Sequence, residues 1–389
     1  KIDEKAIKEL DDFTKKEIEK LEEKIYKLAK IKFNINSTQQ LSEVLFNRLK
    51  IKGKIRKTPK GKLSTRAGEL EKLIEAHPII PLILNYRELQ KLKTTYIDPF
   101  PKLISPKDKR LHTTFIQTGT VTGRLASQNP NLQNIPIKTE LGQKFRKVFI
   151  TEKGYKLLSL DYSQLELRIV AHIAEDEKMI KAFRQGEDIH LKTAAEVLDV
   201  SPENVTPRMR REAKALNFGI IYGMGPLGFA RSAGIAQAEA KKFIEKYFQE
   251  FPKIKEYMDK MREEARDRGI VKTLFGRQRR LNEIYSSIPE FARQAERMAI
   301  NFPIQGTASD LMKMAMIKIW DHLHRNYSNQ DAKMLLQVHD ELVFEIKEEL
   351  AEKLALELKK IMENVYQLKA PLIADAKIGD NWHDLKLID

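Results

Sequence analysis

The sequence predicts an α+β fold in which a long helical segment is inserted into a β region. Two short apolar runs, 157–160 and 334–338, have the length and composition of buried strands, and each leads into a cluster of acidic residues. These clusters lie about 180 residues apart, and the chain between Ile169 and about Arg325 is mostly helical in pattern. We therefore expect the insertion to bring both clusters together, beside a separate helical N-terminal region.

The composition favours a protein with a sizeable core and a polyanionic partner. The chain has 389 residues, 42% of them hydrophobic, so it can form more than one subdomain. Lysine and arginine number 70 against 55 acidic residues, a net charge of +15. Nucleic acid is the commonest partner of such a chain, although a basic soluble protein without that partner has the same charge.

The composition argues against disulfides, cysteine-ligated metal sites and membrane-spanning segments. The chain has no cysteine, which rules out disulfides and thiolate metal sites and favours magnesium-type oxygen ligation over structural zinc. No apolar run approaches the ~20 residues that span a bilayer, and no signal peptide opens the chain. We expect a soluble, cytoplasmic protein, associated with the nucleoid if it is cellular. Its Lys- and Glu-rich composition is also typical of thermostable proteins.

The N-terminal region is predicted to be helical. Within residues 1–30, Ile18, Leu21, Ile25 and Leu28 form a narrow apolar seam suited to packing on a second helix. Ser37 and Gln40 predict a capping box at the start of the next helix. Helical patterning resumes from about Ala67 through Lys93.

A basic loop separates these helices. Residues 50–62 hold no acid, and Gly53, Pro59 and Gly61 disfavour regular structure. The loop's seven cations are Lys50, Lys52, Lys54, Arg56, Lys57, Lys60 and Lys62. Such a loop can hold a phosphate backbone because each neutralised phosphate releases counterions. The alternative is a solvated loop that contacts nothing.

The pattern becomes strand-like after three prolines at 99, 101 and 106. Residues 111–116 are short and rich in β formers, so we place a domain boundary near residue 105. The helical insertion is expected to contain loops at 185–186 and 201–202. After Met334 we expect a hairpin, a helix through roughly 348–366 and a last strand near 372–377.

The acidic clusters are candidate metal ligands. Asp161 ends a buried-strand pattern, and Asp340 lies at the tip of an apolar hairpin. With a backbone carbonyl such as that of Tyr162, two such carboxylates could hold two Mg²⁺ ions about 3.5–4 Å apart. Either aspartate alone would more often be an unrelated turn or N-cap residue.

Between the clusters lies a helical face of cationic and aromatic residues. Arg210, Lys214, Phe218 and Tyr222 recur every four residues and therefore form one slowly winding stripe. Two cations near the N-terminal end of a helix, assisted by its dipole, can hold a triphosphate, and an aromatic ring can stack on a base or sugar. Gly223 would end the helix. Taken alone, the stripe also fits a helix with a partly buried aromatic seam.

Six segments together resemble family A DNA polymerases, the bacterial DNA polymerase I type. DYSQLELR, RREAKALNFGIIYG and QVHDE resemble motifs A, B and C of that family, in the same order and spacing. The segments TGRLASQNPNLQNIP at 122–136, PIQGTASDLMKMAM at 303–316 and YRELQKLKTTYIDPF at 86–100 resemble further signatures. The resemblance covers almost the whole chain, from near residue 20 to the C-terminus.

The resemblance implies a role for each matching residue. Asp161 and Asp340 would bind both catalytic metal ions, with the Tyr162 carbonyl as a further ligand and Glu341 in a lesser role. Arg210, Lys214 and His190 would bind the triphosphate, with Lys214 as proton donor to pyrophosphate. The remaining nucleotide-binding residues would be Gln164, Phe218, Tyr222 and Glu166, the last as the steric gate against a 2′-hydroxyl. The DNA-binding residues would be Arg124, Asn131, Gln133, Arg297, Gln305 and His339.

The resemblance also implies a right-hand architecture: a helical thumb at 1–105, an antiparallel-sheet palm at 106–168 and 334–389, and helical fingers at 169–333. In the family a short palm segment and an exonuclease-like domain precede the thumb. Because the chain already begins within the first thumb helix, we expect a piece of a longer protein, without a proofreading nuclease.

The expected function is template-directed addition of dNTPs to a primer 3′-hydroxyl, with Mg²⁺, or Mn²⁺ in its place, and release of pyrophosphate. The partners would be primer–template DNA and dNTPs, with no membrane, and the protein would be a monomer. One alternative is a single-subunit RNA polymerase, which Glu166 and Phe218 disfavour. The other is a catalytically inactive nucleic-acid-binding module, which the combination of Asp161, Asp340 and the two helix cations disfavours.

Overall fold

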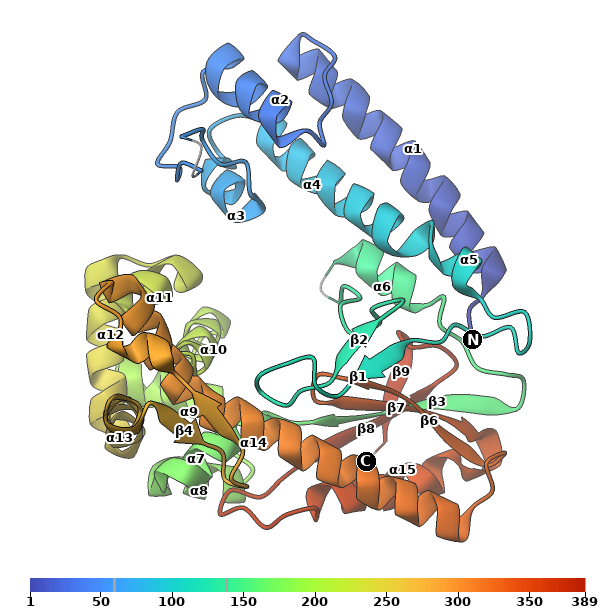
Figure 1. Cartoon of the computed structure of the whole chain (residues 1–389), viewed down its shortest axis with the longest axis vertical. Coiled ribbons are helices and arrows are strands. Elements are labelled where there is room, and N and C mark those ends of the chain that lie inside the picture. The colour runs from blue at the N-terminus through green and yellow to red at the C-terminus, as the bar shows by residue number, and fades with distance from the viewer. Residues whose placement is uncertain (59–60, 138, 389) are drawn as a thin grey trace. The chain divides into compact units, whose positions relative to one another are not determined.

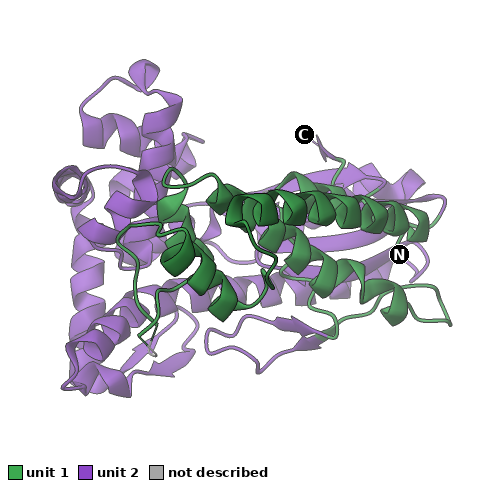
Figure 2. Ribbon diagram, turned by 90° about the horizontal axis from the view of Figure 1, so that it is seen from above, with its two compact units in different colours: residues 1–114, 129–152, 381–384 green, residues 115–128, 153–380, 385–389 purple. Residues whose placement is uncertain are grey.

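The computed structural model of the chain describes residues 1–58, 61–137 and 139–388. These residues form two compact units (Figure 2). The first comprises residues 1–114, 129–152 and 381–384, and the second comprises residues 115–128, 153–380 and 385–389. None of the described helices is both long enough and apolar enough to cross a membrane.

The first unit is built on two long helices that lie side by side (Figure 1). Helix α1, Glu4–Ala29, begins at Asp3, whose side chain accepts hydrogen bonds from two backbone amides of the first turn. Its predicted apolar seam is confirmed, since Ile18 and Ile25 are buried in the core that α1 shares with α4, Ile79–Leu92. The remaining helices are α2, Thr38–Ser42; η1, Glu43–Arg48; α3, Ala67–Leu70; η2, Glu71–Leu73; η3, Lys93–Ile97; α5, Phe100–Leu103; and α6, Glu140–Arg146.

Two expectations for this unit need correction. The Ser37 hydroxyl does cap α2 by accepting from Gln40 N, but the Gln40 side chain accepts from Asn34 N and not from Ser37, so the capping box is one-sided. The helical stretch predicted from Ala67 through Lys93 is interrupted before Ile79, because Pro78 precedes α4 as its N-cap and cannot donate a backbone hydrogen bond.

The second unit contains a five-stranded antiparallel sheet in the order β6-β7-β3-β8-β9. Its strands are β3, Tyr155–Tyr162; β6, Ala332–Val338; β7, Glu341–Lys347; β8, Ala374–Gly379; and β9, Leu385–Ile388. The central strand β3 therefore comes from one side of the helical insertion and its neighbours β7 and β8 from the other. This confirms the predicted α+β fold with a β region split in sequence. Helix α15, Ala351–Glu363, packs on the sheet and also contacts α14.

The insertion is helical, as the sequence predicts, with breaks at the two predicted loops. Its elements are α7, Leu165–Ala174; α8, Glu177–Arg184; α9, Ile189–Leu198; η4, Pro202–Asn204; α10, Pro207–Ile221; α11, Pro226–Ala233; α12, Gln237–Glu250; α13, Pro252–Arg268; η5, Asn282–Tyr285; and α14, Pro289–Asn326. It also carries an unexpected hairpin of β4, Ile270–Lys272, and β5, Gln278–Arg280. A second hairpin joins β1, Thr114–Ile116, to β2, Ala126–Gln128.

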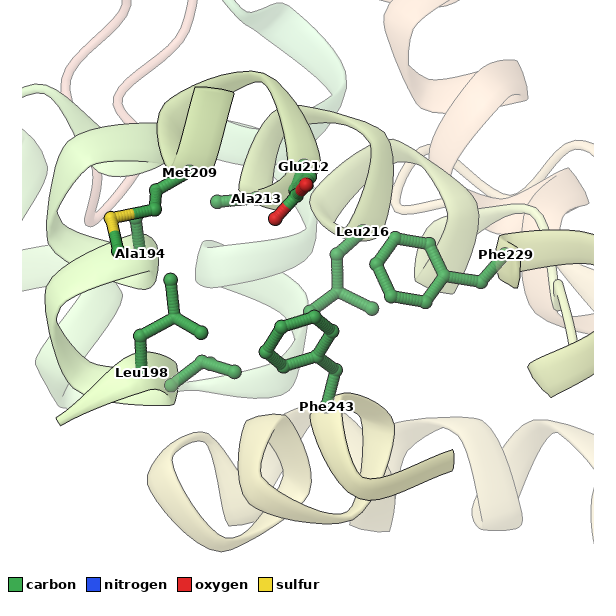
Figure 3. A pocket seen from close by; sticks show the side chains of 9 residues that line it. Ala194, Leu198, Met209, Glu212, Ala213, Leu216, Phe229 and Phe243 are labelled. Atoms are coloured by element: carbon green, nitrogen blue, oxygen red, sulfur yellow. The ribbon is translucent and has the colours of Figure 1, made fainter. Parts of the chain in front are cut away.

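Helix α10 has one face committed to packing. Leu216 and Ala213 on this face line a small apolar pocket with residues of α9, α11 and α12, among them Leu198, Phe229 and Phe243 (Figure 3). Glu212 lines the same pocket and Asn217 is buried, whereas Arg211 and Lys214 are exposed. The packing therefore determines which residues of the helix are available to a ligand.

Candidate active site

The two acidic clusters meet across neighbouring strands of the sheet. In the antiparallel register Asp161 of β3 lies opposite Glu341 of β7 on one side and Asp375 of β8 on the other. The backbone amide of Tyr162 donates to the Asp340 carbonyl at 3.1 Å, which ties the end of β3 to the β6–β7 turn. Residues 180 positions apart are thereby held together by main-chain hydrogen bonds, as the sequence predicts.

The pKa of Asp161 is raised within this cluster. Asp161 remains solvent-accessible, yet enclosure by the surrounding protein, followed by the charges of Glu341 and Asp340, raises its pKa to about 7. Burial raises the pKa of Asp340 as well, with Arg124 opposing. Glu341 is held by the Ser159 hydroxyl, which donates to its Oε1 at 2.6 Å.

These donors suit a hard divalent cation. They are carboxylate and carbonyl oxygens. A bound cation would offset the repulsion between Asp161 and the neighbouring carboxylates. Among the described residues no three acidic or histidine side chains are gathered into a coordination shell. The cluster thus supplies oxygen ligands and negative charge that suit Mg²⁺. The residues that would hold the ion are Asp161, Asp340, Glu341 and, through its carbonyl, Tyr162.

Glu166 joins the acidic strand to the cationic helix. Gln164 adopts a left-handed backbone conformation, φ 54°, and turns the chain from β3 into α7, so that Glu166 lies in the first helical turn. Its side chain is only 6% exposed. Arg124 donates to one carboxylate oxygen at 2.7 Å, and the Tyr222 hydroxyl donates to the other at 2.9 Å. Gln305 of α14 donates to the Tyr222 hydroxyl at 3.2 Å. Four residues to which the resemblance assigns nucleotide or DNA binding therefore form one hydrogen-bonded chain.

The stripe on α10 is present but is less uniform than expected. Arg210 lies in the first turn, where its guanidinium contacts Asp188 Oδ2 through both Nε and a terminal nitrogen at 2.7 Å. Lys214 lies mid-helix, so the helix dipole, which acts mainly within the first turn, contributes little there. Lys214 is exposed, and no ion pair holds it in the part of the chain that the structure describes.

The C-terminal end of the stripe is fixed by a glycine turn. Tyr222 is the C-cap of α10, and Gly223 follows with φ 65°. Gly223 N donates to Ile220 O and Met224 N donates to Gly219 O, which is the Schellman arrangement. A Cβ at Gly223 would also lie 2.8 Å from the side chain of Arg297 on α14. The absence of a side chain at Gly223 thus allows the end of α10 to lie close to Arg297, and the predicted helix end is confirmed.

His190 lies in the first turn of α9 and is 2% exposed. Its ring is 5.8 Å from the ring of Phe218, centroid to centroid, so two predicted nucleotide-binding residues are neighbours. Burial lowers the pKa of His190 to about 4; the charge of Asp188 opposes this, and those of Lys214 and Arg210 add to it. The imidazole is neutral at physiological pH.

The predicted DNA-binding residues divide between the two units. Arg124, Arg297, Gln305 and His339 belong to the second unit, where Arg124 and His339 line a shallow pocket beside Asp340. Asn131 and Gln133 belong to the first unit, where the Asn131 side chain accepts from Gln133 N at 2.9 Å. In the basic loop Lys50, Lys52, Lys54, Arg56, Lys57 and Lys62 are all exposed, whereas Lys60 and Pro59 lie outside the described residues.

Sequence reasoning missed four polar residues of this region. Asp188 holds Arg210, and Asn217 holds His190 with Thr193 beside it, while Asp375 adds a further carboxylate next to Asp161. Asn217 could have been predicted, because an asparagine on an apolar helix face between Lys214 and Phe218 needs a buried hydrogen-bond partner. The other three depend on contacts that spacing does not reveal.

Comparison with known proteins gives consistent matches. The model of DNA polymerase family A matches residues 4–384. The chain is 50% identical over 372 residues to the thermostable DNA polymerase I of Thermus aquaticus, covering 95% of this chain and 44% of that protein. It is 49% identical over 386 residues to DNA polymerase I of Caldicellulosiruptor bescii, covering 99% and 45%. The chain thus spans less than half the length of these curated relatives.

A solved structure matches the fold over nearly the same extent. It is the POL domain of Pol1 from M. smegmatis in complex with DNA primer-template and dNTP, with 38% identity and a TM-score of 0.92. The match covers 98% of this chain and 67% of that one.

Proposed function

The chain belongs to DNA polymerase family A, and we propose from this premise that it adds deoxynucleotides to a DNA primer 3′-hydroxyl under the direction of a template. The observation that carries the proposal is the connection of the acidic strand ends to the cationic helix α10 through Glu166 and Tyr222. The solved relative's DNA primer-template and dNTP support the assignment of substrates.

The proposed chemistry divides among the residues of the site. Two Mg²⁺ ions, or Mn²⁺ in their place, bound by Asp161, Asp340 and the Tyr162 carbonyl with Glu341 nearby, would lower the pKa of the attacking hydroxyl and neutralise the leaving pyrophosphate. Arg210 and His190 donate hydrogen bonds to the triphosphate, and Lys214 donates to it and supplies the proton that pyrophosphate takes up on leaving. The Phe218 ring packs against the incoming nucleotide.

The proposal is tested by primer extension with dNTPs and, separately, with rNTPs. Extension with dNTPs alone supports the DNA polymerase. Extension with rNTPs at equal efficiency would support the RNA polymerase alternative, and binding without extension would support the inactive module. The domain boundaries at 105, 168 and 333, the monomeric state, the thermostability, the nucleoid location and the lack of a proofreading nuclease in this chain remain predictions.

Replacing Glu166 by alanine is expected to relax sugar selection. Its buried carboxylate, fixed between Arg124 and Tyr222, would occupy the space that a 2′-hydroxyl needs once Arg210 and Lys214 hold the phosphates. We predict that Glu166→Ala raises rNTP relative to dNTP incorporation at least about tenfold, ~1.4 kcal/mol. The measurement is the ratio of kcat/KM for dCTP and CTP.

A matched variant separates the bulk of Glu166 from its charge. Glu166→Gln keeps the size of the side chain, and its amide can accept from Arg124 and donate to the Tyr222 oxygen. It should therefore discriminate nearly as well as the native protein if bulk is the gate. An unchanged dCTP/CTP ratio in Glu166→Ala would show that Glu166 is not the gate and would weaken the case against the RNA polymerase.

Neutralising the basic loop is expected to weaken DNA binding. All its described cations are exposed, so they are available to phosphates. Replacing Lys50, Lys52, Lys54 and Lys57 by alanine should lower affinity for primer–template and flatten its dependence on salt, by up to about 0.9 in the slope of log affinity against log salt per lost phosphate contact. Replacing four exposed lysines of α1, such as Lys8, Lys16, Lys20 and Lys24, controls for net charge. If the slope of log affinity against log salt is unchanged in the loop variant, the loop is a solvated loop that does not contact DNA.

A further inference from the structure

A buried polar cluster lies between α9 and α10 and includes His190, one of the predicted triphosphate-binding residues. Asn217 of α10 is 1% exposed, Thr193 of α9 is 0% exposed and His190 is 2% exposed. The Asn217 amide nitrogen lies 3.0 Å from His190 Nδ1 and 3.0 Å from Thr193 Oγ1. Buried polar groups cost free energy unless they are paired, so this cluster needs a reason beyond packing.

The hydrogen bonds of the cluster can be assigned in one direction. The Thr193 hydroxyl has a single proton, and its shortest contact is with Ile189 O at 2.7 Å, one helical turn earlier. Its oxygen is therefore left to accept from Asn217, whose amide places both Nδ2, at 3.0 Å, and Oδ1, at 3.2 Å, against it. The direction of the second contact follows from the amide atom that faces the histidine, which is Nδ2 and not Oδ1. The amide nitrogen therefore donates to His190 Nδ1.

This assignment determines the state of the His190 ring. A ring nitrogen that accepts from an amide carries no proton, so Nδ1 is bare and Nε2 carries the proton of the neutral imidazole. Protonation at Nδ1 would meet an N–H donor, and the neighbouring cations Arg210 and Lys214 also disfavour an imidazolium. Within the described chain, Nε2 makes no hydrogen bond.

We propose that Asn217, packed against Thr193, is a positioning residue that holds His190 in its Nε2–H tautomer so that the ring can donate a hydrogen bond to the triphosphate of the incoming nucleotide. The inference rests on the proposed function and deepens it. Without Asn217 the imidazole is free to exchange tautomers and to rotate. It then presents a bare nitrogen, which repels a phosphate oxygen, for part of the time.

The decisive experiment compares Asn217→Ala in two backgrounds. In the native background the KM for dNTP should rise about tenfold, the size expected for weakening one hydrogen bond to a charged group, with a smaller change in kcat. In a His190→Gln background the glutamine amide always carries a donor and has no tautomer to control. There Asn217→Ala should change KM less than about twofold. An equal loss in both backgrounds would overturn the proposal, because Asn217 would then act on packing alone.

Threonine variants provide a matched pair. Thr193 and Thr14 are both fully buried in helices, and both donate to the carbonyl four residues earlier at 2.7 Å. Thr193→Val removes the hydroxyl that lies against both atoms of the Asn217 amide and should raise KM for dNTP several-fold, whereas Thr14→Val in α1 should leave it unchanged. Equal KM values for the two variants would contradict the role of Thr193.

The tautomer itself can be observed without any activity. Two-bond ¹H–¹⁵N correlation spectra of histidine-labelled protein, assigned with His190→Gln, should show Nε2 protonated and Nδ1 bare. Asn217→Asp, which offers an acceptor in place of the donor, should move the proton to Nδ1. A native ring already protonated at Nδ1 would overturn the inference even if the protein is a polymerase. A native chain that fails to extend primers would instead remove the proposed function.

Discussion

Replacing Asp161 or Asp340 by alanine is expected to reduce primer extension below roughly one thousandth of the native rate, since bound metal ions stabilise several kcal/mol of developing charge. The two residues sit where β3 meets the β6–β7 turn, at the centre of the carboxylate cluster. Affinity for primer–template should be nearly unchanged, because it comes mainly from Lys and Arg contacts with phosphates. Single-turnover extension and fluorescence anisotropy measure the two quantities.

Asp380→Ala is a suitable control, because Asp380 lies just beyond β8 and pairs with Lys156, well along the strand from Asp161. It should extend primers normally. Burial, followed by the charges of Glu341 and Asp340, disfavours the ionised form of Asp161 and raises its pKa, so above pH 7 removal of this carboxylate should not lower the Tm. Near-native extension by either Asp161→Ala or Asp340→Ala would refute the two-metal assignment.

The strands that carry these aspartates were predictable because each is a short apolar run bounded by polar residues. Residues 157–160 and 334–338 follow that pattern and form β3 and β6. Strand β7 lies between these two strands, and burial of its residues 342–346 is consistent with the register that places Glu341 opposite Asp161. The hairpin β4–β5 was missed because its strands have three residues each and include charged side chains. Strand β9 was missed for a similar reason, as it is a partly exposed edge strand.

The residues of the candidate site that would contact a ligand through a charged group were predictable from the sequence. The residues that only hold those groups in place were not. Asp161, Lys214 and Glu166 stand out as charges within apolar or helical patterns. Asn217, Thr193 and Asp188 act through contacts between residues that are 22 to 27 positions apart in the chain, and periodicity carries no information on which polar residues will face each other. The mid-helix place of Lys214 was likewise not apparent until α10 was seen to begin at Pro207.

Replacing Lys214 by alanine is expected to lower the rate of the chemical step by about 10²–10³, within the range for loss of a general acid. Lys214 is exposed and does not line the apolar pocket between α10 and its neighbours, and its ammonium is not held by an ion pair in the described chain. Arg210, by contrast, is held by Asp188. Arg210→Ala should therefore mainly raise KM for dNTP, whereas Lys214→Ala should mainly lower kcat.

Two comparisons show whether Lys214 supplies a proton or only a charge. Lys214→Arg keeps the charge, but a guanidinium does not readily give up a proton, so a proton donor would not be replaced by it. In addition, a nucleotide whose β,γ-bridge carries electron-withdrawing halogens releases a less basic leaving group, which needs less protonation. The deficit of Lys214→Ala should shrink at least about tenfold with that nucleotide. If Lys214→Arg is fully active, or if the deficit is the same for both leaving groups, Lys214 acts as a phosphate-binding charge and the proton comes from elsewhere.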